Sequence, residues 1–172
     1  MHQPDGAAFD IVLLLHVACV VVGLVTTTAA VATASRLRRL LQAGGPLPEP
    51  LRRYFRPGIN WAGRTIYGIP VFGFALIAMS QGAYALRDGW ILGGLALFAG
   101  AALLAEGVLW PAERRLQRGL AAGPEPGPVD TTATPAAEAV PAVEADAKAM
   151  GRAAAVTLVL FILGTVLMIA QP

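Results

Sequence analysis

Charged residues are scarce in this chain of 172 residues, of which only 14% are Asp, Glu, Lys or Arg. In a soluble domain, about a quarter of all residues are usually charged. The mean hydropathy of the whole chain is +0.61. Both values indicate a protein that lies in a lipid bilayer.

Cysteine and histidine are almost absent as well. Cys19 is the only cysteine, which excludes an intramolecular disulfide and a CxxC motif. The only histidines are His2 and His16, and His2 lies in the short polar lead, so a haem held by two histidines of one subunit is disfavoured. The first ten residues contain no Lys or Arg, so the positive region of a cleavable signal peptide is missing.

Enzyme signatures and internal repeats are also missing. The chain contains no P-loop, GxSxG, HExxH or GxGxxG pattern. No repeat with a period of roughly 20 to 50 residues is visible. The sequence therefore indicates no recognised enzyme class, and we expect no metal site.

Four apolar runs are long enough to cross a bilayer as helices. The first, Ile11–Ala34, has 24 residues, or about 36 Å of helix, against about 30 Å of hydrocarbon. The other three are roughly Thr65–Tyr84, Trp90–Trp110 and Ala153–Ala170. The sequence predicts an all-α fold, a transmembrane bundle of four helices.

The remaining segments divide the chain into predicted regions. Residues 1–8 form a short polar lead, and residues 9–118 hold the first three spans with a basic loop at 35–63. Residues 119–147 are rich in Ala, Pro and Glu without large apolar periodicity, which predicts a disordered linker. The last region, residues 148–172, contains the fourth span.

Two features predict the local course of the chain. Residues 35–42, SRLRRLLQ, place their leucines on one face, which favours a helix that runs out of the membrane and lies along its surface. Pro70 lies inside the second span and predicts a kink or a widened turn near residues 66–69.

Arginines concentrate in two of the three loops. The second loop has only Arg87, offset by Asp88, and neither terminus carries Lys or Arg. The positive-inside rule places the two basic loops in the cytoplasm and both termini outside. Twelve of the 13 basic residues are arginines and, with the abundance of Ala, Gly and Pro, this composition is typical of a GC-rich bacterium, so we expect a bacterial cytoplasmic membrane. The basic residues of the two loops are Arg36, Arg38, Arg39, Arg52, Arg53, Arg56 and Arg64, and Arg114, Arg115, Arg118, Lys148 and Arg152.

The arginines of the first loop also suggest a partner. Basic clusters beside membrane spans attract anionic lipid headgroups, and we expect such contacts. The clusters flank spans and belong to no folded soluble domain, which disfavours nucleic acid. The arginines concerned are Arg36, Arg38, Arg39, Arg52, Arg53 and Arg56.

Arg64 and Glu106 are charged residues at matching depths of neighbouring spans. Arg64 lies near the start of the second span and Glu106 one turn before the end of the third. We expect a salt bridge, or a polar cluster shared with Asn60, Trp61 and Tyr67. Such a pair either fixes the packing of the two spans or forms a substrate or proton site at the cytoplasmic mouth.

His16 and Cys19 lie in the first span on a stripe of small and polar residues. The stripe should face the bundle; it contains His16, Cys19, Gly23, Thr27, Ala30 and Ala34. The structural interpretation of His16 is a neutral histidine bonded to a backbone carbonyl or a hydroxyl of another helix. The functional interpretation is a ligand or proton-handling residue, with Cys19 as a second ligand for a soft metal.

Two stretches of the chain carry a family resemblance. They are RYFRPGINWAGRTIYGIPVFGFAL at 53–76 and AEGVLWPAERRLQ at 105–117. The chain resembles the bacterial predicted integral membrane proteins of the DUF2269 family over roughly residues 9–118. That resemblance implies about four spans and no established activity. The histidine in the first span is similar, more weakly, to that of small bundles that handle haem or copper.

Three functional hypotheses follow. The first is a non-enzymatic accessory or scaffold subunit, in contact with another membrane protein or a second copy of the chain. The second is a small transporter with a polar path through His16 and the pair Arg64 and Glu106. The third is a haem- or copper-linked membrane protein that uses His16.

Overall fold

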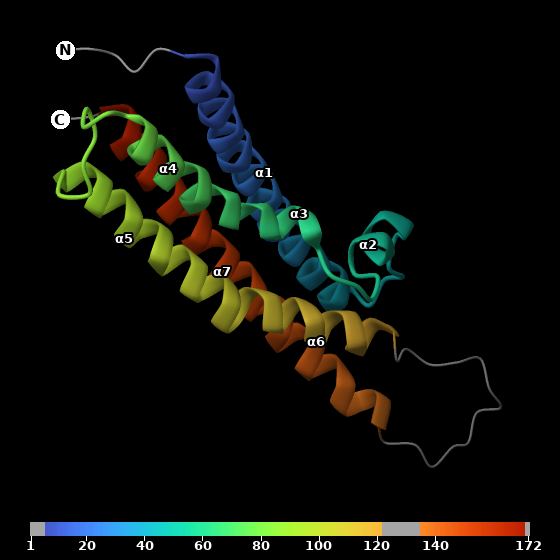
Figure 1. Ribbon diagram of the computed structural model, residues 1–172. Coiled ribbons are helices and arrows are strands. Elements are labelled where there is room, and N and C mark those ends of the chain that lie inside the picture. The colour runs from blue at the N-terminus through green and yellow to red at the C-terminus, as the bar shows by residue number, and fades with distance from the viewer. Residues whose placement is uncertain (1–5, 122–134, 171–172) are drawn as a thin grey trace. The chain divides into compact units, whose positions relative to one another are not determined.

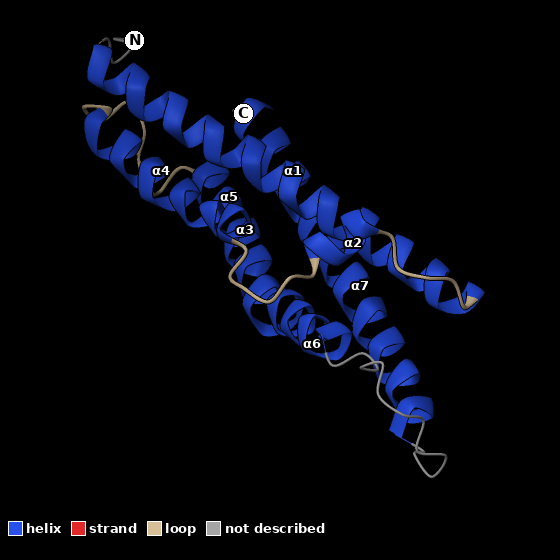
Figure 2. Cartoon of the chain, turned by 90° about the vertical axis from the view of Figure 1, so that its right-hand side faces the viewer, coloured by secondary structure: helices blue, strands red, loops and turns tan. Residues whose placement is uncertain are grey.

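The computed structural model describes residues 6–121 and 135–170, and of residues 135–140 the backbone alone. Within these ranges the regular structure is entirely helical (Figure 2). Four helical stretches are long and apolar enough to cross a membrane: Ala7–Ala43, Trp61–Met79, Gly89–Ala121 and Pro141–Ala170. The expected all-helical chain with four membrane-length helices is confirmed.

The first stretch is a single helix, α1, which runs from Ala7 to Ala43 (Figure 1). Residues 35–42 continue it, so this segment is helical as expected, and its course along a membrane surface stays a prediction. The helix continues because Leu37 is fully buried and residues 35–43 contain no glycine or proline. Gly44 then adopts a positive φ of 63°, and the N–H groups of Gly44 and Gly45 donate to Leu41 O and Leu40 O, a common helix ending.

The second stretch begins after a short helix, α2 (Glu49–Tyr54). It comprises α3 (Trp61–Arg64), the 3₁₀ turn η1 (Thr65–Tyr67) and α4 (Gly68–Met79). The irregularity expected before Pro70 is present, but the turn is tightened rather than widened. Pro70 has no N–H to donate to the carbonyl of the preceding turn, which makes a regular α-helix unfavourable there.

The third stretch contains the widened turn instead. It consists of α5 (Gly89–Leu104), the π turn η2 (Ala105–Leu109) and α6 (Trp110–Ala121). Pro111 lies two residues after the π turn, with Trp110 between them. A wider turn moves the carbonyl of the preceding turn away from the proline ring, with which it would otherwise clash.

The fourth stretch is α7, which runs from Pro135 to Ala170. Of the predicted linker 119–147, residues 119–121 belong to α6 and residues 135–147 to α7, whereas 122–134 lie outside the described residues. Alanine has the highest helix propensity, and alanine recurs throughout the first turns of α7. Ala147 and Met150 are fully buried, so tertiary packing also holds this part of the helix.

The chain divides into two compact units. The first unit comprises Met1–Thr27, Asn60–Leu103 and Val156–Pro172. The second comprises Thr28–Ile59 and Leu104–Ala155. Helices α1 and α7 contribute residues to both units.

Glycines allow close helix packing in the first unit. A Cβ at Gly93 would lie 2.8 Å from Leu167 Cδ2, and one at Gly100 would lie 3.7 Å from Leu160 Cδ1. Residue numbers thus rise along α5 as they fall along α7, so the two helices are antiparallel. Small residues that let backbones approach closely are typical of helix contacts in membranes.

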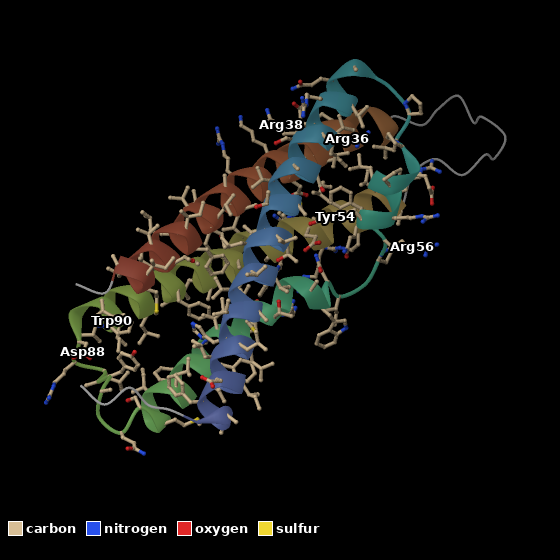
Figure 3. The ribbon with its side chains drawn as sticks, turned by 90° about the horizontal axis from the view of Figure 1, so that it is seen from above. Arg36, Arg38, Tyr54, Arg56, Asp88 and Trp90 are labelled. Carbon is tan, nitrogen blue, oxygen red and sulfur yellow. The ribbon has the colours of Figure 1, made fainter. Side chains whose placement is uncertain are left out.

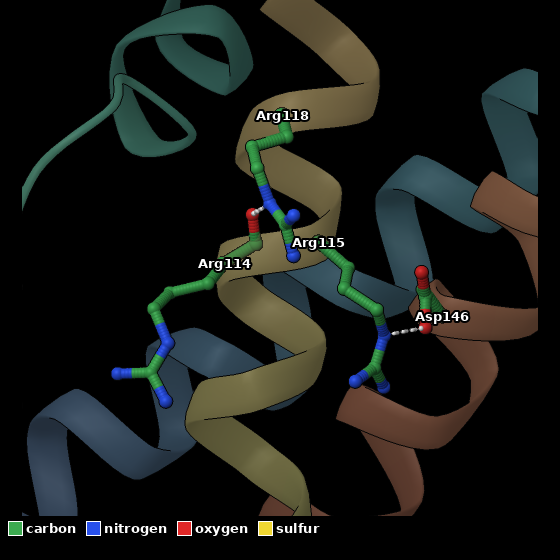
Figure 4. Close-up of polar contacts among 4 residues, drawn as sticks. All are labelled: Arg114, Arg115, Arg118 and Asp146. Atoms are coloured by element: carbon green, nitrogen blue, oxygen red, sulfur yellow. Dashed lines mark hydrogen bonds and ion pairs between the residues drawn. The ribbon is translucent and has the colours of Figure 1, made fainter.

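The second unit has a core of its own. The core draws on α1, α2, α6 and α7, and its members include Leu37, Leu51, Phe55, Leu116 and Met150. Polar contacts surround it: Arg115 Nε of α6 donates to Asp146 Oδ1 of α7 at 2.7 Å (Figure 4). The packed core predominates in holding the second unit, because an exposed ion pair contributes at most about 1 kcal/mol.

Candidate functional site

His16 is bonded to the backbone of the helix beside it. Its Nδ1 lies 2.9 Å from Ile69 O. A carbonyl oxygen only accepts, so Nδ1 carries the proton and Nε2 is the acceptor nitrogen of the neutral ring. The ring lies against Gly73, where an added Cβ would come within 3.4 Å of Cε1. This backbone bond is the arrangement that the structural interpretation of His16 predicts.

Cys19 fills the space left by a glycine. A Cβ at Gly68 would lie 2.5 Å from Cys19 Sγ, and one at Gly23 would lie 3.2 Å from Ile66 Cγ2. The thiol therefore contributes to close packing between α1 and the start of α4. Among the described residues, no group of three or more His, Cys, Asp or Glu side chains could hold a metal ion.

The stripe that contains His16 and Cys19 faces inward along its length. Thr27, Ala30 and Ala34 are all buried, with Ala34 completely inaccessible. The expected inward orientation of these positions is confirmed. Thr27 further satisfies its hydroxyl locally, because Oγ1 donates to Gly23 O at 2.7 Å.

The residues of the predicted polar cluster around Arg64 have different surroundings. Asn60 caps α3, since its Oδ1 accepts from the N–H of Gly63 at 3.2 Å. The side chain of Trp61 is 72% exposed, so it is not enclosed in a polar cluster. Each of Asn60, Arg64 and Tyr67 takes part in a polar, charged or ring interaction. An exposed tryptophan at the start of a span is typical of a membrane–water interface.

Glu106, the expected partner of Arg64, lies in the π turn η2. It belongs to the second unit, whereas Arg64 belongs to the first. Glu106, like Arg64, takes part in an interaction. The pairing of the two residues stays a prediction.

Glu113 is a buried carboxylate that the sequence analysis missed. It is only 6% exposed and lies on α6 beside buried Gln117, whose Nε2 donates to Gly58 O at 3.4 Å. The signal was present: Trp110, Glu113 and Gln117 recur at helical spacing on one face.

Tyr54, which Figure 3 labels, lies on α2, and its pKa responds to the charge of this carboxylate. Burial raises the pKa of Tyr54 above its ordinary value of 10.0, and the charge of Glu113 raises it further. The folded chain therefore keeps this proton at a pH where the unfolded chain has lost it. The stability that Tyr54 contributes is present below pH 10 and is lost as the pH rises further.

Replacing Tyr54 with phenylalanine should remove this alkaline loss. Between pH 10 and 11 the wild-type free energy of unfolding should fall about 1 kcal/mol more than that of Tyr54→Phe. Denaturant titrations in detergent at the two pH values measure the difference. Tyr84→Phe in the first unit is the control, and equal slopes for wild type and Tyr54→Phe would contradict the prediction.

Thr157 of α7 has an unsatisfied hydroxyl. Its side chain is 1% exposed, and Oγ1 has no hydrogen-bond partner among the described residues. A buried polar group without a partner costs about 1 to 3 kcal/mol. Thr157→Val keeps the shape and removes the hydroxyl, so it should raise the free energy of unfolding by about 1 kcal/mol.

Thr27→Val is the matched control for that substitution. Thr27 is also buried, but its hydroxyl is bonded to Gly23 O, so its replacement should lower stability. Thermal melts of both variants in one detergent give the sign of the stability change in each. A loss of stability in Thr157→Val would mean that its hydroxyl has a water or ion as partner.

Two of the polar groups described above lie in different units. In the first unit, His16 and Cys19 pack against α4. In the second, Glu113 and Gln117 of α6 lie with Tyr54 and Gly58 of the preceding segment. No protein-family model, curated protein or solved structure matches the chain.

Proposed function

We propose that the chain is a non-enzymatic scaffold subunit of the bacterial cytoplasmic membrane. One observation carries this proposal: the membrane-length helices extend well beyond the membrane thickness into a packed second unit. Helix α1 has 37 residues and α7 has 36, so each is roughly 55 Å long against about 30 Å of hydrocarbon. The extra turns bury Leu37 and Met150 completely. Membrane-length helices that also contribute residues to a packed unit suit a subunit that holds partners.

The distribution of charge supports an orientation with the basic segments of the second unit in the cytoplasm. All but two of the 13 basic residues fall within the ranges of the second unit, the exceptions being Arg64 and Arg87. Positive charge favours the cytoplasmic side. Both termini then lie outside, as the arginine count predicts.

Reporter fusions test this orientation. A reporter that is active only outside the cytoplasm should be active when fused after Pro172 and inactive when inserted after Ala121. A reporter that is active only in the cytoplasm should give the reverse pattern. If both reporters show Ala121 outside, the proposed orientation fails.

A small proton transporter is the second candidate, and His16 is the observation that favours it. Its Nδ1 is committed to Ile69 O, which leaves Nε2 as the nitrogen that could exchange a proton. A haem- or copper-linked role would use the same nitrogen. The side chain three residues on, Cys19, packs against Gly68 and offers no ready second ligand. The resemblance to the DUF2269 family stays a prediction.

Proton flux separates the two candidates. Proteoliposomes loaded with a pH-sensitive dye should acidify no faster than empty liposomes if the chain is a scaffold. A protein-dependent flux that is lost in His16→Leu but retained in the stripe variant Ala30→Ser would favour the transporter. An absorption spectrum of the same purified protein tests haem or copper binding.

A further inference from the structure

Helices α1 and α7 meet along a seam in the second unit. A Cβ at Gly151 would lie 3.3 Å from Ala34 Cβ, and Gln42 Nε2 donates to Glu144 Oε1 at 3.1 Å. The two contacts show that the helices are antiparallel here. Ala34, Arg38 and Gln42 follow one another at four-residue spacing. Arg38 therefore lies on the edge of α1 that faces α7, between the two contacts.

Arg38 has a buried donor without a partner. Its Nε is buried and makes no hydrogen bond within the described part of the chain. Buried polar groups are nearly always bonded, and an exception often marks an ion or water that completes the site. Figure 3 labels Arg38 on the last turns of α1, with Arg36 beside it.

The seam holds a second cation at the same level. The antiparallel register, bounded by Gly151 and Glu144, places Lys148 level with Arg38, and Lys148 is exposed. The acid of the seam, Glu144, accepts from Gln42. Arg38 and Lys148 thus flank the seam, and neither is paired with a carboxylate of the described residues. An anion would satisfy the Arg38 Nε–H and both charges.

The depth of these cations matches lipid headgroups, if the spans lie as proposed above. The apolar run of α1 ends at Ala34, and Arg38 follows four residues later, about 6 Å along the helix. The last span begins at Ala153, and Lys148 precedes it by five residues, about 7.5 Å. The headgroup region extends roughly 5 to 8 Å beyond the hydrocarbon on each side.

We propose that the seam binds the phosphate of an anionic phospholipid, held by the guanidinium of Arg38 and the ammonium of Lys148. The proposal deepens the proposed function, since it rests on insertion in the membrane. It also separates Arg38 from the other arginines of the first loop. Arg36 and Arg39 are exposed and lie on other sides of α1, where topology alone explains them.

The experiment measures lipid-dependent stability of the full chain. The purified protein in mild detergent is melted, with circular dichroism as the signal, while phosphatidylglycerol, phosphatidylcholine or inorganic phosphate is added. Phosphatidylglycerol should stabilise the wild type, and phosphatidylcholine and phosphate should not. The apparent affinity should fall about fivefold in Arg38→Gln and about as much in Lys148→Gln. Arg36→Gln is the control and should change the affinity much less.

Several results would overturn the site. Equal stabilisation by inorganic phosphate would assign a free anion rather than a lipid. An unchanged affinity for phosphatidylglycerol in Arg38→Gln would show that the seam binds no headgroup. If Arg38→Gln does not fold, an unchanged affinity in both Arg38→Lys and Lys148→Gln would show the same. Extraction of cell membranes with alkaline carbonate separates the two proposals. If the protein stays in the membranes after carbonate extraction but shows no preference for phosphatidylglycerol, the lipid site alone is refuted. If carbonate releases the protein from the membranes, membrane insertion is refuted as well.

Discussion

Leu116→Ala is expected to lower the free energy of unfolding by about 3 kcal/mol, the largest effect anticipated for a single substitution here. Leu116 lies on α6 and is fully buried in the core of the second unit. Truncation removes its buried methyl groups and leaves a cavity that the surrounding helices fill only in part. Denaturant titration in detergent measures the loss.

Proteolysis gives a second measurement of the same loss. Trypsin should cleave Leu116→Ala faster than the wild type at Arg114 and Arg118, which are exposed but held in α6. Leu103→Ala is the matched control, because Leu103 is 74% exposed on the preceding helix, α5. It should change stability by less than about 0.5 kcal/mol. Equal losses in the two variants would mean that the second unit has no packed core.

Gly68→Ala is expected to cost about 2 kcal/mol, because the new methyl group would lie 2.5 Å from Cys19 Sγ. Phe72 and the Cβ of Cys19 also lie within 3.5 Å of the added methyl group, so it cannot move away from the sulfur without meeting another atom. The gain in helix propensity from glycine to alanine, about 1 kcal/mol, only partly offsets this overpacking. Thermal and denaturant unfolding in detergent measure the net loss.

A second substitution and a control make this prediction specific to the contact. Cys19→Ala removes the sulfur, so in the Gly68→Ala background it should restore at least about 1 kcal/mol. Gly100→Ala should be neutral or slightly stabilising, since its Cβ would meet Leu160 Cδ1 at an ordinary 3.7 Å. If Gly68→Ala unfolds like Gly100→Ala, then α1 and α4 are not in close contact at this point.

The spans and the inward stripe of α1 were predictable because they depend on local patterns. Length and hydropathy alone identify four membrane-length helices. The burial of Thr27, Ala30 and Ala34 follows from small residues at helical spacing.

The second unit was not predictable, because a helix does not end where its hydropathy ends. Helix α1 continues past its arginines to Gly44, and α7 begins well before its apolar run. Both extensions depend on packing between distant segments, such as Ala34 against Gly151. A search for apolar runs assigns these polar turns to loops.

Charged residues of one type also differ in ways that sequence alone could not separate. Arg36 and Arg38 are alike as topology signals, but only Arg38 has a buried Nε. Glu113 and Glu106 lie two turns apart, and only Glu113 is buried. These distinctions arise from the neighbours that each side chain meets after folding.

The exposure of Trp61 has a spectroscopic consequence, because the other two tryptophans lie in different surroundings. Trp110 is buried in the second unit, and Trp90 stacks edge-on against Tyr84 with ring centroids 5.8 Å apart. Collisional quenchers in the lipid or the solvent reach Trp61 first and Trp110 last. The indole emission of the unlabelled chain therefore reports on the start of the second apolar stretch, the loop of Tyr84 and the core of the second unit as three separable signals.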